Sequence, residues 1–153
     1  MRAPNLLALW AEGRTRLTKL LEMVTENDLS KKLSPSPNSI GFLIRHIGDA
    51  EMLFAKNVFK LKDLQVYAKT IIAQKDTGEW TNFTSLKGYT NQSATVLQQS
   101  ILQMKEEDWP QSITTAEFGT RTLAEALGRI TTHTAYHAGQ TAVILKYAHL
   151  KIK

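Results

Sequence analysis

The sequence contains no cysteine among its 153 residues. Disulfide bonds, thiolate metal ligands and a cysteine nucleophile are therefore excluded, and any metal must be bound through nitrogen or oxygen. Long apolar runs are also absent, since no stretch approaches the roughly 20 residues that a membrane-spanning helix needs. The first residues lead directly into an amphipathic pattern, which does not resemble a secretory signal. We expect a soluble, cytoplasmic protein with no membrane partner.

Acidic residues are fewer than basic ones, and the formal net charge is +5 at pH 7. The basic residues are spread along the chain, and no run of them resembles the stripe that follows phosphates in nucleic-acid-binding proteins. We interpret the charge as a source of solubility and of some attraction for anionic small molecules, and we expect no nucleic-acid partner.

Apolar residues recur every three or four positions in four stretches, which is typical of amphipathic helices. The predicted helices run from Asn5 to about Val24, from Ser39 to about Lys60, from Thr84 or Ser85 to before Trp109, and from Thr122 to about His149. Ser39 is a good N-cap, and Thr122 with Glu125 has the pattern of a capping box.

The connections between these stretches are long. Two prolines in Ser34-Pro35-Ser36-Pro37 exclude regular helix and favour an extended connection over residues 27–38. We expect residues 61–83 to form a connection that can include a short helix between Val66 and Ala73. We expect residues 111–120 to form a hairpin or loop. The pattern therefore predicts an all-α protein, a four-helix bundle in one domain covering residues 1–153.

Two of the four histidines, His133 and His137, lie four positions apart in the last predicted helix. Residues at this spacing share one helix face, so both rings can reach one ion. His46 lies at the border of the apolar stripe of the second helix and is a candidate third ligand. The alternative is that each ring is a core histidine bonded to a carbonyl or hydroxyl group.

Three neutral imidazoles would leave a fourth metal position for water or substrate, as in catalytic zinc sites. The His-Glu-x-x-His pattern of metalloproteases is excluded because Thr134 follows the first histidine. A base or a group that orients a ligand must come from elsewhere. Asp49 and Glu51 are both candidates for this role, and the alternative of a solvated carboxylate on the helix surface applies more to Glu51 than to Asp49. Gln140 and Tyr136 are candidates to orient substrate or water.

Three further residues of the last helix are interpreted structurally. Gly128 and Gly139 each cost about 1 kcal/mol in a helix relative to alanine, so we expect close packing against a neighbouring helix or a dimer contact there. His149 is expected to complement the dipole at the end of this helix.

Two segments carry a resemblance to a known family: Ser39-Ile-Gly-Phe-Leu-Ile-Arg-His-Ile-Gly-Asp-Ala-Glu51 and His133-x-x-x-His137-x-Gly139-Gln140. Together they resemble the DinB-like superfamily of metal-binding helical bundles, which includes YfiT-type hydrolases and bacterial thiol transferases. The resemblance implies a bundle with crossed connectivity, a homodimer, and a zinc or nickel ion bound by His46, His133 and His137. Many members have an aromatic residue where this chain has Asn38, at the rim of the pocket.

The resemblance does not select one reaction. It implies a metal-dependent enzyme with a small-molecule substrate, acting by transfer of a low-molecular-weight thiol or through metal-activated water as a hydrolase. The alternative is a non-catalytic metal-binding or stress-response bundle.

Overall fold

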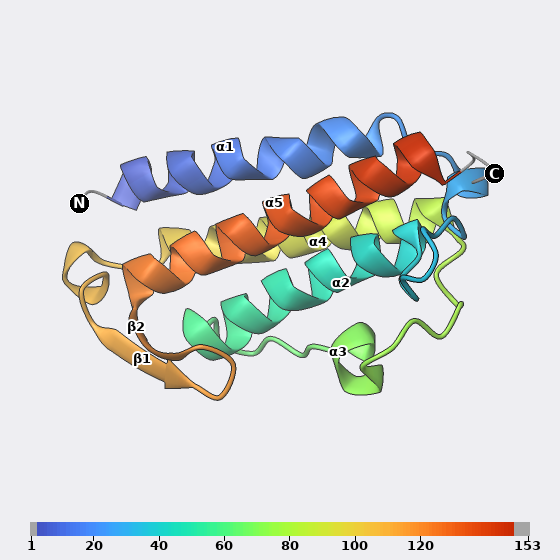
Figure 1. Cartoon of the computed structure of the whole chain (residues 1–153). Coiled ribbons are helices and arrows are strands. Elements are labelled where there is room, and N and C mark those ends of the chain that lie inside the picture. The colour runs from blue at the N-terminus through green and yellow to red at the C-terminus, as the bar shows by residue number, and fades with distance from the viewer. Residues whose placement is uncertain (1–2, 149–153) are drawn as a thin grey trace.

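Four long helices make up most of the computed structural model, which describes residues 3–148 (Figure 1). They are α1 (Ala3–Leu21), α2 (Ile40–Leu53), α4 (Phe83–Leu102) and α5 (Leu123–Tyr147). The shorter elements are a π-helical turn (Phe54–Val58), α3 (Lys69–Ala73), two 3-10 turns (Glu26–Asp28 and Glu106–Asp108), β1 (Ser112–Thr115) and β2 (Gly119–Thr122). The predicted all-α character is confirmed, with one small antiparallel hairpin added.

Each long helix packs against two others. Helix α1 contacts α5 and α4, and α2 contacts the same two helices. Helices α1 and α5 run in one direction, while α2 and α4 run in the opposite direction (Figure 1). The second and last long helices are therefore neighbours, so side chains far apart in the sequence meet between them.

Short local signals set the starts of the helices. The Ser39 hydroxyl accepts a hydrogen bond from Phe42 N at 3.2 Å and caps α2 as predicted. The predicted capping box of α5 is also present, because Glu125 N donates to Thr122 Oγ1 and Thr122 N donates to Glu125 Oε2. The cap of α4 is Asn82, so this helix starts one residue before the predicted Thr84.

One predicted helix end was wrong. Regular helix α2 ends at Leu53 rather than near Lys60, because the next five residues widen into a π-helical turn in which Phe59 N donates to Phe54 O. Helix α4 ends at Leu102, before Trp109 as predicted, and a separate 3-10 turn follows it. Other predictions hold in outline: residues 69–73 of the Val66–Ala73 stretch are helical, and residues 112–122 form the hairpin. His149 lies outside the described residues.

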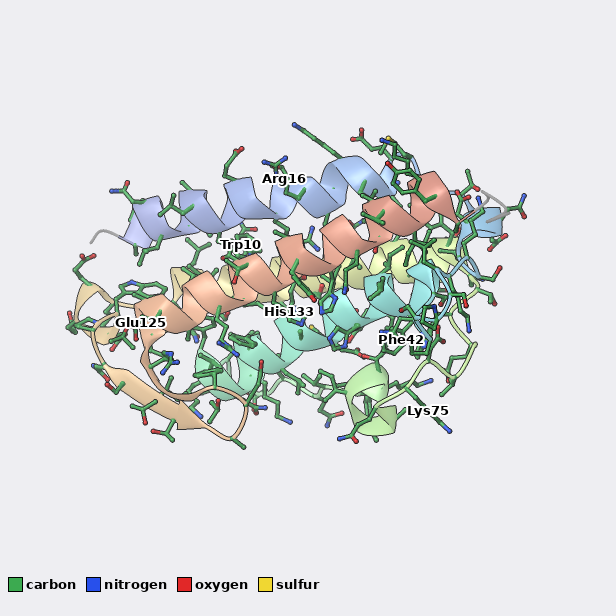
Figure 2. All side chains as sticks on the ribbon, in the orientation of Figure 1. Trp10, Arg16, Phe42, Lys75, Glu125 and His133 are labelled. Atoms are coloured by element: carbon green, nitrogen blue, oxygen red, sulfur yellow. The ribbon has the colours of Figure 1, made fainter. Side chains whose placement is uncertain are left out.

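The buried apolar side chains form two clusters. One contains Trp10, Phe54 and Ile130, and the other contains Leu17, Ile44 and Leu86. Along the length of the molecule, the labelled His133 lies between Trp10 and Phe42, which belong to different clusters (Figure 2). Several buried polar side chains, Arg14, Glu51, Ser93 and Thr134 among them, lie in contact with one another between the long helices.

None of the helices within residues 3–148 combines the length and the apolarity needed to cross a lipid bilayer.

Candidate metal centre

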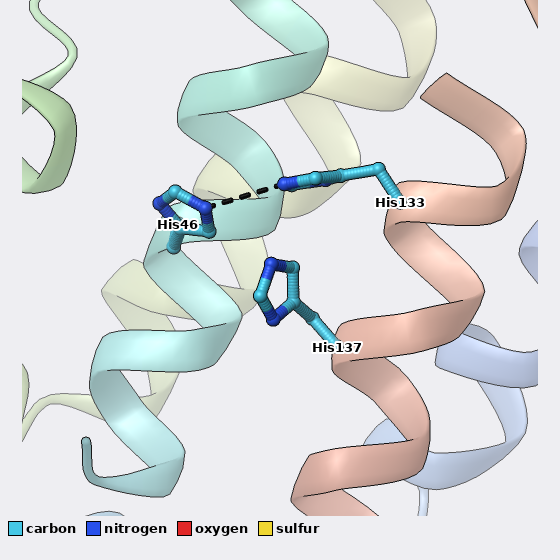
Figure 3. Close-up of side chains that lie close together, drawn as sticks. All are labelled: His46, His133 and His137. Carbon is cyan, nitrogen blue, oxygen red and sulfur yellow. Dashed lines mark hydrogen bonds between the residues drawn. The ribbon is translucent and has the colours of Figure 1, made fainter. Parts of the chain in front are cut away.

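Three histidines meet between α2 and α5. His46 comes from α2, and His133 and His137 come from successive turns of α5. One ring nitrogen from each lies within 4.8 Å of the others, and a ring nitrogen of His137 points toward the other two rings (Figure 3). The structure therefore brings together all three histidines that the sequence suggested.

The spacing of the nitrogens suits a single divalent ion. His46 Nε2 and His133 Nε2 are 3.2 Å apart. Two imidazole nitrogens bound tetrahedrally to zinc, each at its usual bond length, lie about 3.3 Å apart. Little rearrangement is needed for this pair to share an ion, and three imidazole donors suit zinc, copper, iron and nickel alike.

Hydrogen bonds orient two of the three rings. The Thr70 hydroxyl donates to Asp49 Oδ2 at 2.7 Å, so its oxygen is left to accept from His46 Nδ1 at 3.2 Å. Gln140 Oε1 likewise accepts from His137 Nδ1 at 2.6 Å. Both rings then carry their proton on Nδ1, which leaves the Nε2 lone pair free to bind a metal.

His133 is less well satisfied. Its Nδ1 is buried and, among the described residues, has no hydrogen-bond partner. A core histidine retained for packing alone is expected to have both nitrogens bonded, since an unpaired buried polar group is costly. The orphaned Nδ1 is not the nitrogen that faces His46, so a ligand site is indicated by the convergence of the three rings and by the Nε2 spacing, and not by this unpaired atom.

All three rings are held neutral. Burial, reinforced by the neighbouring His137, lowers the pKa of His46 to about 4 and that of His133 to about 3. Burial also lowers the pKa of His137. Neutral imidazole is the form that binds metal, so protons do not compete for these nitrogens near neutral pH.

Asp49 lies behind His46 rather than in the site. It is fully buried, and its carboxylate accepts hydrogen bonds from Arg45 Nε, the Tyr89 hydroxyl and both the N–H and hydroxyl of Thr70. Tyr89 comes this close because Gly48 has no side chain, and a Cβ there would lie 2.6 Å from the Tyr89 ring. With four donors around it, Asp49 can act on the site only through Thr70 and His46.

The alternative of a solvated carboxylate, which the sequence favoured more for Glu51 than for Asp49, was wrong for both residues. Glu51 is fully buried, and its carboxylate accepts from Arg14 Nε at 3.0 Å and from the hydroxyl of Ser93. Arg14 also donates to the Thr90 carbonyl at 2.7 Å, and the Thr134 hydroxyl donates to Glu51 at 3.4 Å. This network joins all four long helices beside the histidines. The sequence did not reveal it because the two charged partners are 37 positions apart.

The expected close packing at Gly128 and Gly139 was also wrong. A Cβ at either position would meet no atom within 4 Å. Gly139 instead faces a pocket, and the side chain of Tyr136 is 65% exposed. Gly139 and Tyr136 are therefore open to solvent or to a ligand.

Pockets lie on both sides of the histidines. One of about 290 Å³ includes Asn38, Leu43, Gly139 and Gln140, so the Asn38 position noted in the sequence does lie at a pocket. Two others, of about 590 and 310 Å³, share His133, Phe54 and Glu117 in their walls. The histidines are thus accessible to a small molecule.

Glu117 and Arg129 were missed by sequence reasoning. Glu117 lies in the turn between β1 and β2, and Arg129 lies one helical turn before His133; both line the pocket of about 590 Å³. A glutamate in a hairpin turn gives no pattern that points to a site 16 residues further along the chain. Arg129 could have been noticed, because it shares a helix face with His133.

The comparisons with known proteins agree with this geometry. A family model described as the DinB superfamily matches residues 9–141. A crystal structure of the mycothiol-dependent maleylpyruvate isomerase superposes with a TM-score of 0.67, and that of a histidine-to-alanine mutant of the isomerase with 0.63. Each is 19% identical over 95% of this chain and 61% of the isomerase chain. The chain thus spans less than two thirds of the isomerase, and the likeness shows the fold. A search of the curated proteins gives no match.

Proposed function

This chain belongs to the DinB superfamily, and we propose that it is a divalent-metal-dependent enzyme that transfers a low-molecular-weight thiol to a small electrophile. The observation that carries the proposal is the cluster of His46, His133 and His137, with its nitrogens within 4.8 Å of one another. Three protein ligands are the number that catalytic zinc sites use. The mycothiol dependence of the structurally similar isomerase supports thiol chemistry over hydrolysis.

The residues of the chain have distinct roles in this proposal. The three histidines hold zinc or nickel through neutral nitrogens. Asp49 positions His46 through Thr70, and Gln140 positions His137. A divalent ion bound there supplies Lewis-acid chemistry, which favours the thiolate form of a thiol.

We also propose that the four long helices form a crossed bundle in a single domain. In support, α1 and α2 share no major contact although they are consecutive long helices, while both contact α4 and α5. The homodimer implied by the resemblance remains part of the proposal and is tested by the mass of the protein in solution.

The proposed function is tested by metal content and thiol dependence together. Protein purified without a histidine tag is expected to contain about one zinc or nickel ion per chain. With 1-chloro-2,4-dinitrobenzene as electrophile, turnover is expected only when a thiol from a panel of low-molecular-weight thiols is added. Zinc-loaded protein that turns over activated esters without thiol would instead identify a hydrolase. Protein that holds no metal would point to a non-catalytic bundle.

Substitution of Thr70 tests the positioning of His46. Thr70→Val is expected to lower the zinc affinity by about 10- to 100-fold, because His46 Nδ1 loses its acceptor and Asp49 loses its link to the ring. Competition with a chromophoric chelator measures the affinity. Thr70→Ser restores the hydroxyl and should rescue binding, and Thr114→Val on the exposed hairpin is the control. Equal affinities for Thr70→Val and Thr114→Val would contradict the role of Thr70.

A further inference from the structure

The wall of the pocket of about 590 Å³ at His133 carries a loosely held pair of opposite charges. Arg129 Nε and Glu117 Oε1 are 3.9 Å apart, and their side chains are 45% and 60% exposed. Within residues 3–148 the Arg129 guanidinium makes no hydrogen bond, and Glu117 is its partner only at the limit of an ion pair. Exposed pairs with such geometry contribute little to stability. Arg129 is therefore available to another anion.

The guanidinium is nevertheless held in place. Arg129 Cζ, the central carbon of the guanidinium, lies 5.5 Å from the centre of the Phe118 ring, which is a cation–π contact. Phe118 is itself buried, with its ring 5.9 Å from that of Phe54, which lines the same pocket as Arg129. Because the side chain already packs against a fixed aromatic ring, Arg129 loses less conformational entropy when it binds a ligand.

Arg129 is also close to the metal ligands. It precedes His133 by four residues, so the two side chains occupy adjacent turns of one face of α5. Both line the pocket of about 590 Å³, together with the aromatic side chains of Phe54 and Tyr136. The positive charge of Arg129 contributes to keeping the pKa of His133 low. A molecule of moderate size can therefore reach Arg129 and the histidine cluster at once.

We propose that Arg129 binds the carboxylate of the substrate and that Glu117 is the counter-ion which this carboxylate displaces. The substrate class is then an organic acid with an apolar or aromatic body, which contacts Phe54 and Tyr136 and places its reacting carbon near the histidines. A guanidinium binds a carboxylate through two parallel hydrogen bonds, a geometry that the present pair with Glu117 does not reach. The net charge of +5 also favours anions. This inference rests on the proposed function for the role of the ligand as substrate, whereas the binding itself can be measured alone.

The experiment compares benzoate with its neutral isostere benzamide. Their dissociation constants are measured by calorimetry on zinc-loaded and zinc-free full-length protein, because benzoate can also bind a metal directly. Arg129→Gln is expected to weaken benzoate binding about tenfold in both forms and to leave benzamide unchanged. Glu117→Gln is expected to strengthen benzoate binding, since it removes the competing carboxylate. Arg121→Gln, a loss of the same charge from the neighbouring strand β2, should change neither.

The outcomes separate this inference from the proposed function. If Arg129→Gln leaves the ratio of benzoate to benzamide affinity unchanged, or weakens both ligands equally, the inference is overturned even when zinc binds. If Glu117→Gln weakens benzoate, the pair is a structural contact between the hairpin and α5, and the inference also fails. Protein that binds no zinc overturns the proposed function, and the zinc-free measurements still decide the role of Arg129.

Discussion

His133→Ala is expected to lower the zinc affinity of the protein by more than about 100-fold, beyond the loss that follows from disturbing a group behind a ligand. The reason is geometric: His133 Nε2 lies 3.2 Å from His46 Nε2, and both nitrogens belong to the cluster that faces one point. Loss of one donor leaves two, which rarely hold a divalent ion at low concentration. Zinc affinity is measured by competition with a chromophoric chelator, and thiol-dependent turnover should fall with it.

The same substitution is expected to change the stability of the metal-free protein only slightly. Removing a partly buried ring loses packing, but it also removes Nδ1, whose burial without a partner costs about 1–3 kcal/mol. These contributions have opposite signs. His149→Ala, which removes the fourth histidine of the sequence, is the control for zinc binding. Unchanged zinc affinity in His133→Ala would show that His133 is not a metal ligand. A large drop in thermal stability would show that the ring serves mainly in packing.

Arg14→Met is expected to reduce the free energy of unfolding by about 3–5 kcal/mol, because it leaves the carboxylate of Glu51 buried without its charged partner. Glu51 is fully buried and the Arg14 side chain is only 10% exposed, so water cannot replace the lost contact. Ser93 and Thr134 continue to donate to Glu51, but neither carries a charge. Chemical denaturation monitored by circular dichroism measures the change.

Two further variants test whether this loss of unfolding free energy comes from the unpaired charge of Glu51. The double variant Arg14→Met with Glu51→Leu removes both charges and should recover most of the stability, since apolar replacement of a whole buried pair is often neutral or stabilising. Lys69→Met breaks the exposed pair with Glu79, whose side chains are 58% and 47% exposed, and should cost less than about 1 kcal/mol. A loss in Arg14→Met no larger than that in Lys69→Met would contradict the importance of the buried pair.

The sequence by itself determined the features that depend on near neighbours in the chain. The apolar periodicity predicted the four long helices, the Ser39 and Thr122 caps predicted two of their starts, and the spacing of His133 and His137 placed two candidate ligands on one face. Helix ends were less predictable. The apolar periodicity does not predict the π-helical turn after Leu53, and the 3-10 turn before Trp109 is capped locally by Asp108, whose Oδ2 accepts from Lys105 N.

The candidate site could be predicted only in part, because some of its residues are far apart in the sequence. His133 and His137 are a suggestive pair at helical spacing, but His46 lies 87 positions before His133, and only the packing of α2 against α5 brings their nitrogens together. Thr70 gave no sequence signal, because its role depends on contact with both Asp49 and His46.

Only the tertiary structure decided which charged side chains are buried and which are exposed. Glu51 and Glu117 are both glutamates in ordinary sequence contexts, and yet one is enclosed with Arg14 and the other lies at the pocket beside Arg129. Burial of a charge depends on a partner supplied by another helix, and helical periodicity does not identify that partner. The sequence therefore determined the two histidines on α5, and the packing of α2, α3 and the hairpin around them decided what else the candidate site contains.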